Sequence, residues 1–101
     1  MNFVNLTPHA ITLNNGETFA SQGVARVSAT FTSFEDNVCK QTFGDLVGLP
    51  EPCENTRYVV SALVLSAAKE AGRTDCVAPA TGHPDCVRKD GFIVSVPGFV
   101  C

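Results

Sequence analysis

The sequence has no long hydrophobic run and no export signal. None of its apolar stretches approaches the ~18 residues that span a bilayer. Residues 1–13 have neither the basic start nor the apolar centre of a signal peptide. We therefore expect no membrane partner and a protein that stays in the cytoplasm of its cell.

Clustered positive charge is also missing. Ten acidic and seven basic residues give a net charge of −3, and the basic residues are scattered. Only Arg88 and Lys89 are adjacent, and Asp90 follows them. A protein that binds nucleic acid needs a concentrated positive face to contact the phosphates. We therefore expect no nucleic-acid partner.

The short motifs of common catalysts and metal sites are absent. The chain has no glycine-rich phosphate loop, no Gly-x-Ser-x-Gly elbow and no Cys-x-x-Cys pair. His83 and Cys86 are three residues apart, but zinc usually takes four ligands in close pairs. A thiol paired with His9 or His83 has no local group to activate it. We expect a protein that is not an enzyme and has no metal or other cofactor.

Five cysteines are present, which is an odd number. Without an export signal, they are expected to be free thiols that pack as small hydrophobic groups in a reducing compartment. If a disulfide formed in the purified protein, the expected pair would be Cys76 and Cys86. The five residues are Cys39, Cys53, Cys76, Cys86 and Cys101.

The length and the apolar content predict one folded domain over residues 1–101. A chain of this size buries roughly two thirds of its unfolded surface. Alternating apolar residues and turn signals predict many short strands. The fold class is therefore α+β: a compact, mainly antiparallel sheet or small open barrel with one packed helix. The strands are expected at residues 5–13, 18–21, 24–31, 38–43 with an extension over 44–49, 56–60, 76–77, 87–88 and 92–96.

The single helix is expected over about residues 61–72. Ser61 can cap its start by accepting a hydrogen bond from a free N–H group. Gly72 stands where a left-handed residue ends many helices. The apolar side chains expected to face the sheet are those of Leu63, Val64, Ala67 and Ala71.

A binding site can be placed at the ends of this helix. The N–H groups after Ser61 could hold an anion, and Arg73 and Asp75 follow the far end. A ten-residue helix spans roughly 15 Å, so both ends could share a small site only through a neighbouring subunit. The favoured interpretation of Arg73 and Asp75 is a structural ion pair. Arg26 and Arg88 would complete the set if a nucleotide were the ligand.

Several segments occur in an order that resembles a family of small proteins encoded by phages, prophages and actinobacterial genomes. The resemblance covers nearly the whole chain, and it brings no catalytic or binding residues with it. The segments are residues 5–11 (NLTPHAI), 23–27 (GVARV), 43–52 (FGDLVGLPEP), 56–61 (TRYVVS) and 73–79 (RTDCVAP), followed by Val87-Arg88 and a glycine turn.

The resemblance implies an accessory phage protein, among which inhibitors of host defence are frequent. Such an inhibitor would act in the host cytoplasm by binding a host protein or by sequestering a nucleotide signal. A virion structural or assembly protein that forms homo-oligomers through its sheet is the alternative. A small metal protein or hydrolase is a third hypothesis.

Overall fold

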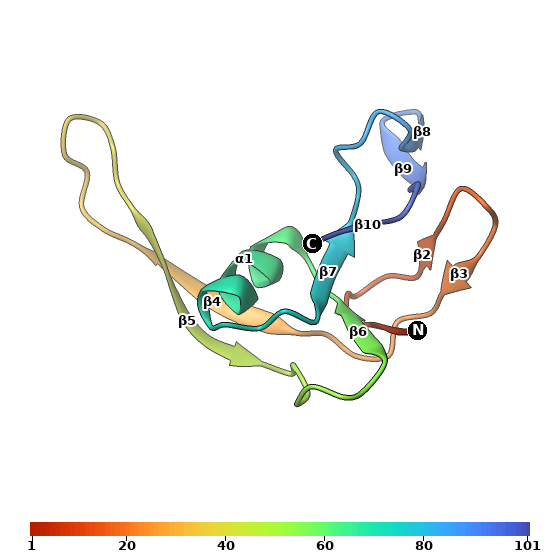
Figure 1. Ribbon diagram of the computed structural model, residues 1–101. Coiled ribbons are helices and arrows are strands. Elements are labelled where there is room, and N and C mark those ends of the chain that lie inside the picture. Colours follow the sequence, from red (N-terminus) through yellow and green to blue (C-terminus); the bar gives the residue numbers. More distant parts are fainter.

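A four-stranded sheet of mixed direction lies at the centre of the computed structural model, which describes residues 1–101 (Figure 1). The strand order is β1-β6-β7-β10, with β1, β6 and β7 parallel and β10 antiparallel to β7. Val59 and Val60 are fully buried beside β7, as expected of β-branched residues on a central strand. The bounds are β1 Asn2–Asn5, β6 Thr56–Val59, β7 Cys76–Pro79 and β10 Phe99–Val100.

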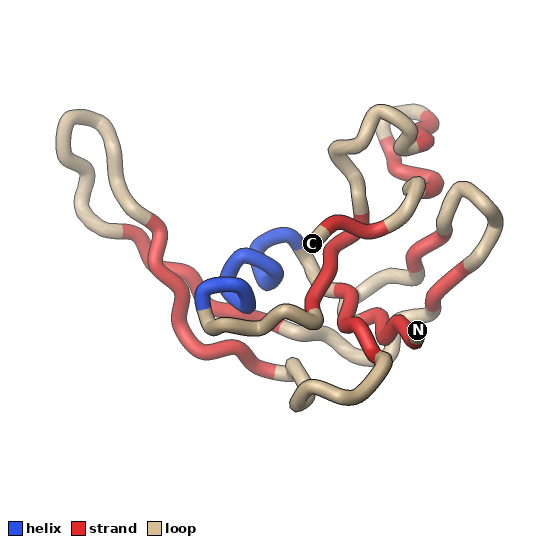
Figure 2. The backbone as a smooth tube through the Cα atoms, viewed as in Figure 1, coloured by secondary structure: helices blue, strands red, loops and turns tan.

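Three hairpins extend from this centre (Figure 2). They are β2 Ile11–Thr12 with β3 Thr18–Phe19, β4 Arg26–Phe31 with β5 Gln41–Val47, and β8 Val87–Lys89 with β9 Phe92–Ser95. One helix and mostly antiparallel pairing confirm the α+β class. No sheet closes into a barrel, so the barrel alternative is not the one formed.

The helix α1, Ala62–Glu70, lies within the predicted bounds. The Ser61 hydroxyl accepts a hydrogen bond from the Val64 N–H at 3.3 Å. Gly72 has a φ of 84°, and the N–H groups of Gly72 and Arg73 donate to the Lys69 and Ala68 carbonyls at 3.0 and 2.9 Å. This pair of bonds is the Schellman arrangement that ends many helices.

The buried face of the helix differs from the prediction. Val64 and Ala67 are buried as expected, but Leu63 is 41% exposed and Ala71 is exposed. Leu65 and Ala68 take their places. The helix lies across β7 and the bases of β4 and β5, and this orientation turns Leu63 outward.

The hydrophobic core lies between α1 and one face of the central sheet. Its nine buried residues are Leu6, Ala25, Tyr58, Val60, Val64, Leu65, Ala68, Cys76 and Ala78. A smaller aromatic cluster lies apart from it, where the rings of Phe3, Phe19 and Phe99 have centroids 5.0–5.8 Å apart. Phe3 precedes Val4, which packs against the core, and neighbouring residues of a strand point to opposite faces.

Two strand predictions need correction. The strand expected at residues 5–13 is divided, because β1 ends at Asn5 and β2 begins only at Ile11. The strand expected at residues 38–43 begins later and continues without a break to Val47 as β5. The pairing is irregular within β5, because Val27 pairs with Leu46 and Ala29 with Phe43, which leaves Gly44 and Asp45 opposite Ser28 alone.

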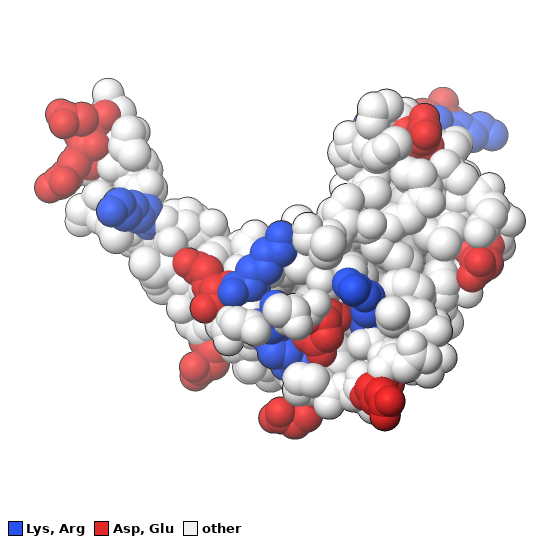
Figure 3. Space-filling model, viewed as in Figure 1, with Lys and Arg blue, Asp and Glu red and all other residues white.

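The outline is a saddle. The β4–β5 hairpin projects to one side of α1, while the β2–β3 and β8–β9 hairpins project to the other (Figure 1). The space-filling view shows a hollow between these projections (Figure 3). The largest dimension is 46 Å and the smallest is 19 Å.

Candidate functional site

The carboxyl ends of the three parallel strands lie at one edge of the central sheet. The segment around His9 follows β1, Ser61 follows β6, and Ala80 and Thr81 follow β7. Ligands of open parallel sheets bind outside this edge, where the chain leaves neighbouring strands. The edge is therefore the first place to examine for a site.

A pocket of about 270 Å³ lies at this edge. Three separate parts of the chain line it: the segment entering β2, the end of β7, and β9. Its walls are mainly aliphatic, with an imidazole and three hydroxyl groups among them. The lining residues are His9, Ala10, Ile11, Thr12, Pro79, Thr81, Ile93, Val94, Ser95 and Val96.

The first wall is held in place by Asn5, a fully buried polar residue. Its Oδ1 accepts hydrogen bonds from the N–H and the hydroxyl of Thr7, at 3.0 and 2.6 Å. Its Nδ2 donates to the carbonyls of His9 and Phe19, at 2.8 and 2.9 Å. This network curls the chain after β1 and explains why one strand does not continue to Leu13.

The opposite wall is tied to the N-terminal hairpin through Ser95, which is 9% exposed. Its hydroxyl donates to Asn14 Oδ1 at 2.6 Å, and Asn14 Nδ2 donates to the Asp85 carbonyl at 2.9 Å. The backbone N–H of Val96 also donates to the Thr12 carbonyl at 3.0 Å. The two buried polar residues of the chain, Asn5 and Ser95, therefore fix opposite sides of one pocket.

Strand β9 exposes large apolar side chains in and beside the pocket. Phe92 is 77% exposed, Val94 53% and Ile93 46%. Ile93 and Val94 line the pocket, and Phe92 precedes them on β9 without lining it. Large apolar side chains exposed in and beside an apolar pocket are typical of an interaction surface. We call the pocket and these three residues the β9 surface.

Two of the sequence-predicted site residues lie at this edge. Ser61 follows β6 there, although it does not line the pocket. Arg88 Nη2 donates to the Thr81 carbonyl at 2.8 Å and so steadies the wall that follows β7.

Arg73 and Asp75 lie at the opposite edge, because they precede the parallel strand β7. Arg73 Nε and Nη2 donate to the two Asp75 carboxylate oxygens at 3.0 and 2.8 Å. Nη2 also donates to the Pro50 carbonyl at 2.8 Å. Hydrogen bonds from Arg73 lower the pKa of Asp75, and the same bonds raise the pKa of Arg73. This geometry confirms the predicted structural pair.

The predicted cations do not gather around one ligand site. Arg26 lies on β4 and shares a shallow hollow with Asp45. Arg26 is the first residue of β4, which packs against α1, whereas Arg88 lies on β8, in a hairpin that projects away from α1 (Figure 1). A nucleotide phosphate would need several of these groups to converge, which this arrangement does not provide.

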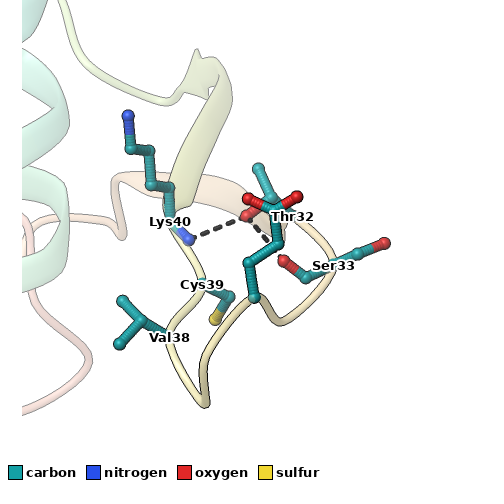
Figure 4. Close-up of a pocket in the computed structure, with 6 residues that line it drawn as sticks. Thr32, Ser33, Val38, Cys39 and Lys40 are labelled. Carbon is teal, nitrogen blue, oxygen red and sulfur yellow. Dashed lines mark hydrogen bonds between the residues drawn. The ribbon is translucent and has the colours of Figure 1, made fainter.

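A larger hollow, of about 480 Å³, lies at the tip of the β4–β5 hairpin (Figure 4). It is bounded only by side chains of the hairpin's own end, where the Lys40 N–H donates to the Thr32 hydroxyl at 2.8 Å. The hollow is thus the space inside a turn, and no second element closes over it. The lining residues are Thr32, Ser33, Glu35, Val38, Cys39 and Lys40.

All five cysteines are unpaired, including Cys76 and Cys86. Burial raises the pKa of the Cys76 thiol, which packs in the core. No group of three or more His, Cys, Asp or Glu side chains is placed to hold a metal ion. The single helix, with nine residues, is too short to cross a membrane.

The residues that build the pocket were not among the predicted site residues. Asn5 carries one usable signal, since an Asn two residues before a Thr or Ser commonly forms a side-chain turn. Ser95 and Asn14 carry none, because their contact joins positions 81 residues apart. Comparison with known protein families, curated proteins and solved structures found no match for this chain, so its function must be inferred from these residues.

Proposed function

We propose that this protein is a phage-type accessory protein that inhibits a host defence by binding a host protein in the host cytoplasm. The observation that carries the proposal is the β9 surface, an apolar pocket with large exposed apolar side chains in and beside it. Protein interfaces concentrate their binding energy where an aromatic or aliphatic side chain fills such a pocket. The resemblance to phage-encoded proteins supplies the biological setting.

The pocket is suited to this role because its walls are held before a partner arrives. Asn5 fixes the segment that carries His9, and Ser95 fixes β9 against the N-terminal hairpin. Binding costs less conformational entropy when the receiving surface is already ordered. A partner side chain entering between Ile11 and Val94 would contact aliphatic groups, and hydroxyl groups nearby could accept or donate hydrogen bonds.

Protein binding is favoured over sequestration of a nucleotide because of the charge distribution. The pocket is lined by one histidine and by no lysine or arginine. Arg88 uses one guanidinium nitrogen on the Thr81 carbonyl, and Arg73 is paired with Asp75. Calorimetry with cyclic nucleotides and ADP-ribose derivatives tests the nucleotide hypothesis, and we expect no heat of binding.

The test is capture of a host protein by the tagged chain in an expressing or infected host. Phe92→Ser and Val94→Asp alter the β9 surface at exposed positions, so the fold should survive them. Val38→Ser is the matched control, because Val38 is 67% exposed on the other side of the molecule. We expect a host protein that wild type and Val38→Ser retain in stoichiometric amount and that the two β9 variants lose. Equal capture by all four chains would overturn the proposal.

A further inference from the structure

The chain exposes more surface than a protein of its size normally does. Its accessible area is 6696 Å², whereas about 5,500 Å² is typical of a 10.7 kDa monomer. The radius of gyration is 15.0 Å, against about 13 Å for a compact domain of this length. The excess is roughly 1,200 Å². In a protein–protein interface of standard size each partner buries ~800 Å² of its surface, so the excess is larger than that share.

Much of this extra surface belongs to the β4–β5 hairpin. No residue of β4 or β5 is fully buried, and the outer half carries three exposed apolar side chains. Phe31 is 66% exposed, Phe34 73% and Val38 67%. We call residues 26–47 the arm.

Backbone hydrogen bonds join the two sides of the arm beyond the last ladder pair, Phe31 and Gln41. The N–H groups of Glu35 and Val38 each donate to the other residue's carbonyl, at 2.8 and 2.9 Å. Asp36 and Asn37 between them have φ values of 51° and 67°, the left-handed pair that suits a tight hairpin turn. The Thr32 N–H also donates to the Lys40 carbonyl at 2.8 Å.

Two properties of the arm favour a bound partner. β4 and β5 form hydrogen-bonded pairs only with each other, so each has a free edge. A lone two-stranded ribbon is marginally stable in water, and a free edge invites another strand. A partner that is present whenever the chain is present would remove both liabilities.

We infer that the arm is a self-association surface, and that its occupant is the arm of a second copy of this chain. The area is sufficient, since the whole-chain excess of roughly 1,200 Å² leaves room for the ~800 Å² that each partner buries in a standard interface. A twofold axis would place the same apolar residues of both copies together. The inference does not depend on the proposed host partner, because the β9 surface lies on the other side of the saddle.

The charge at the tip selects the arrangement of the two arms. Glu35 and Asp36 make the tip acidic (Figure 3), so two tips placed end to end would repel each other. An antiparallel arrangement, with each tip beside the base of the other arm, separates these charges. It also brings Phe31 of each copy, which lies midway along the arm, to the middle of the contact, with Phe34 nearer the base of the other arm.

The test is the mass of the protein in solution, measured by sedimentation over a wide range of concentration. We expect wild type to have twice the 10.7 kDa mass of one chain. Phe34→Ser and Val38→Ser should each raise the dimer dissociation constant by about tenfold or more. Phe92→Ser is the matched control, an equally exposed phenylalanine on the β9 surface, and should leave the dimer intact.

Three outcomes would overturn the inference. One is a wild-type chain that is monomeric at every concentration. The second is a dimer that both arm variants leave intact, and the third is a dimer that Phe92→Ser dissociates instead. Circular dichroism shows whether each variant is folded, and a second arm variant guards against the loss of one. Failure here leaves capture of a host protein at the β9 surface unaffected, so the two proposals fail separately.

Discussion

The hydroxyl of Ser95 donates a hydrogen bond of 2.6 Å to the side chain of Asn14, a residue 81 positions earlier. This bond joins the last hairpin of the chain to the first. It is also one of the bonds that hold β9 in place as a wall of the candidate pocket. The two ends of the sequence therefore build one surface together.

Replacing Ser95 should cost stability. Ser95→Ala leaves the Asn14 Oδ1 atom without its partner, and we expect a loss of about 1–2 kcal/mol in the free energy of unfolding. Urea unfolding followed by circular dichroism measures it. Ser66→Ala is the control, because the Ser66 hydroxyl is exposed and bonds only within the helix. A Ser95 variant as stable as the Ser66 variant would contradict the role given to this bond.

Replacing Asn5 should cost more. Asn5→Ala removes four hydrogen bonds from a fully buried site, and we expect a loss of about 3 kcal/mol. Asn15 is the comparison. Its side chain also forms hydrogen bonds with the residue two positions later, Glu17, but these bonds are exposed to solvent. Asn15→Ala should cost under about 1 kcal/mol. Similar losses for the two variants would show that the Asn5 network is unimportant.

The Arg73–Asp75 pair should make stability depend on pH in the acid range. Asp75 has a lowered pKa when folded, so the ionised carboxylate stabilises the fold above its ordinary pKa of 3.8. That stabilisation is lost as the pH falls below 3.8 through the lower, folded value. At neutral pH, Asp75→Asn should be less stable than wild type by about 1–2 kcal/mol.

Denaturant unfolding of both chains from neutral to acid pH checks this prediction. The gap between wild type and Asp75→Asn should narrow only at acid pH, as the carboxylate of the folded chain becomes protonated. A gap that is constant over the whole range would mean that the charge of Asp75 does not contribute.

Two glycines with similar backbone angles should respond differently to alanine. Gly48 and Gly72 have φ values of 83° and 84°. A Cβ on Gly48 would lie 2.6 Å from the Val24 carbonyl oxygen, whereas one on Gly72 would meet nothing within 4 Å. We expect Gly72→Ala to cost about 1 kcal/mol for the left-handed backbone alone. Gly48→Ala should cost clearly more in the same thermal or urea unfolding measurement, and equal losses would count against the close approach of Gly48 to the Val24 carbonyl.

Local signals explain which parts of the fold could be predicted from the sequence. Ser61 and Gly72 mark the ends of α1 by hydrogen bonds within a few residues. The turn at Asp90 and Gly91 likewise depends only on their own backbone preferences. The ion pair of Arg73 and Asp75 joins residues two apart, and it was foreseen.

Contacts between distant residues explain the rest. Strand β1 stops at Asn5 partly because the Asn5 side chain donates a hydrogen bond to the Phe19 carbonyl, 14 residues away. Phe31 continues the alternating pattern of buried residues, yet it is exposed because the arm extends past the central sheet. The pocket escaped prediction since it is lined from His9 to Val96, nearly the length of the chain.

The most direct test of the central claim, that the β9 surface receives a host protein, is photocrosslinking from defined positions. A photoreactive phenylalanine analogue replaces Phe92 in one chain and Phe34 in another, and each chain is irradiated in the host. We expect the analogue at position 92 to crosslink to a host protein and the analogue at position 34 to crosslink to a second copy of the chain. Crosslinks to a host protein from position 34, with none from position 92, would contradict the account.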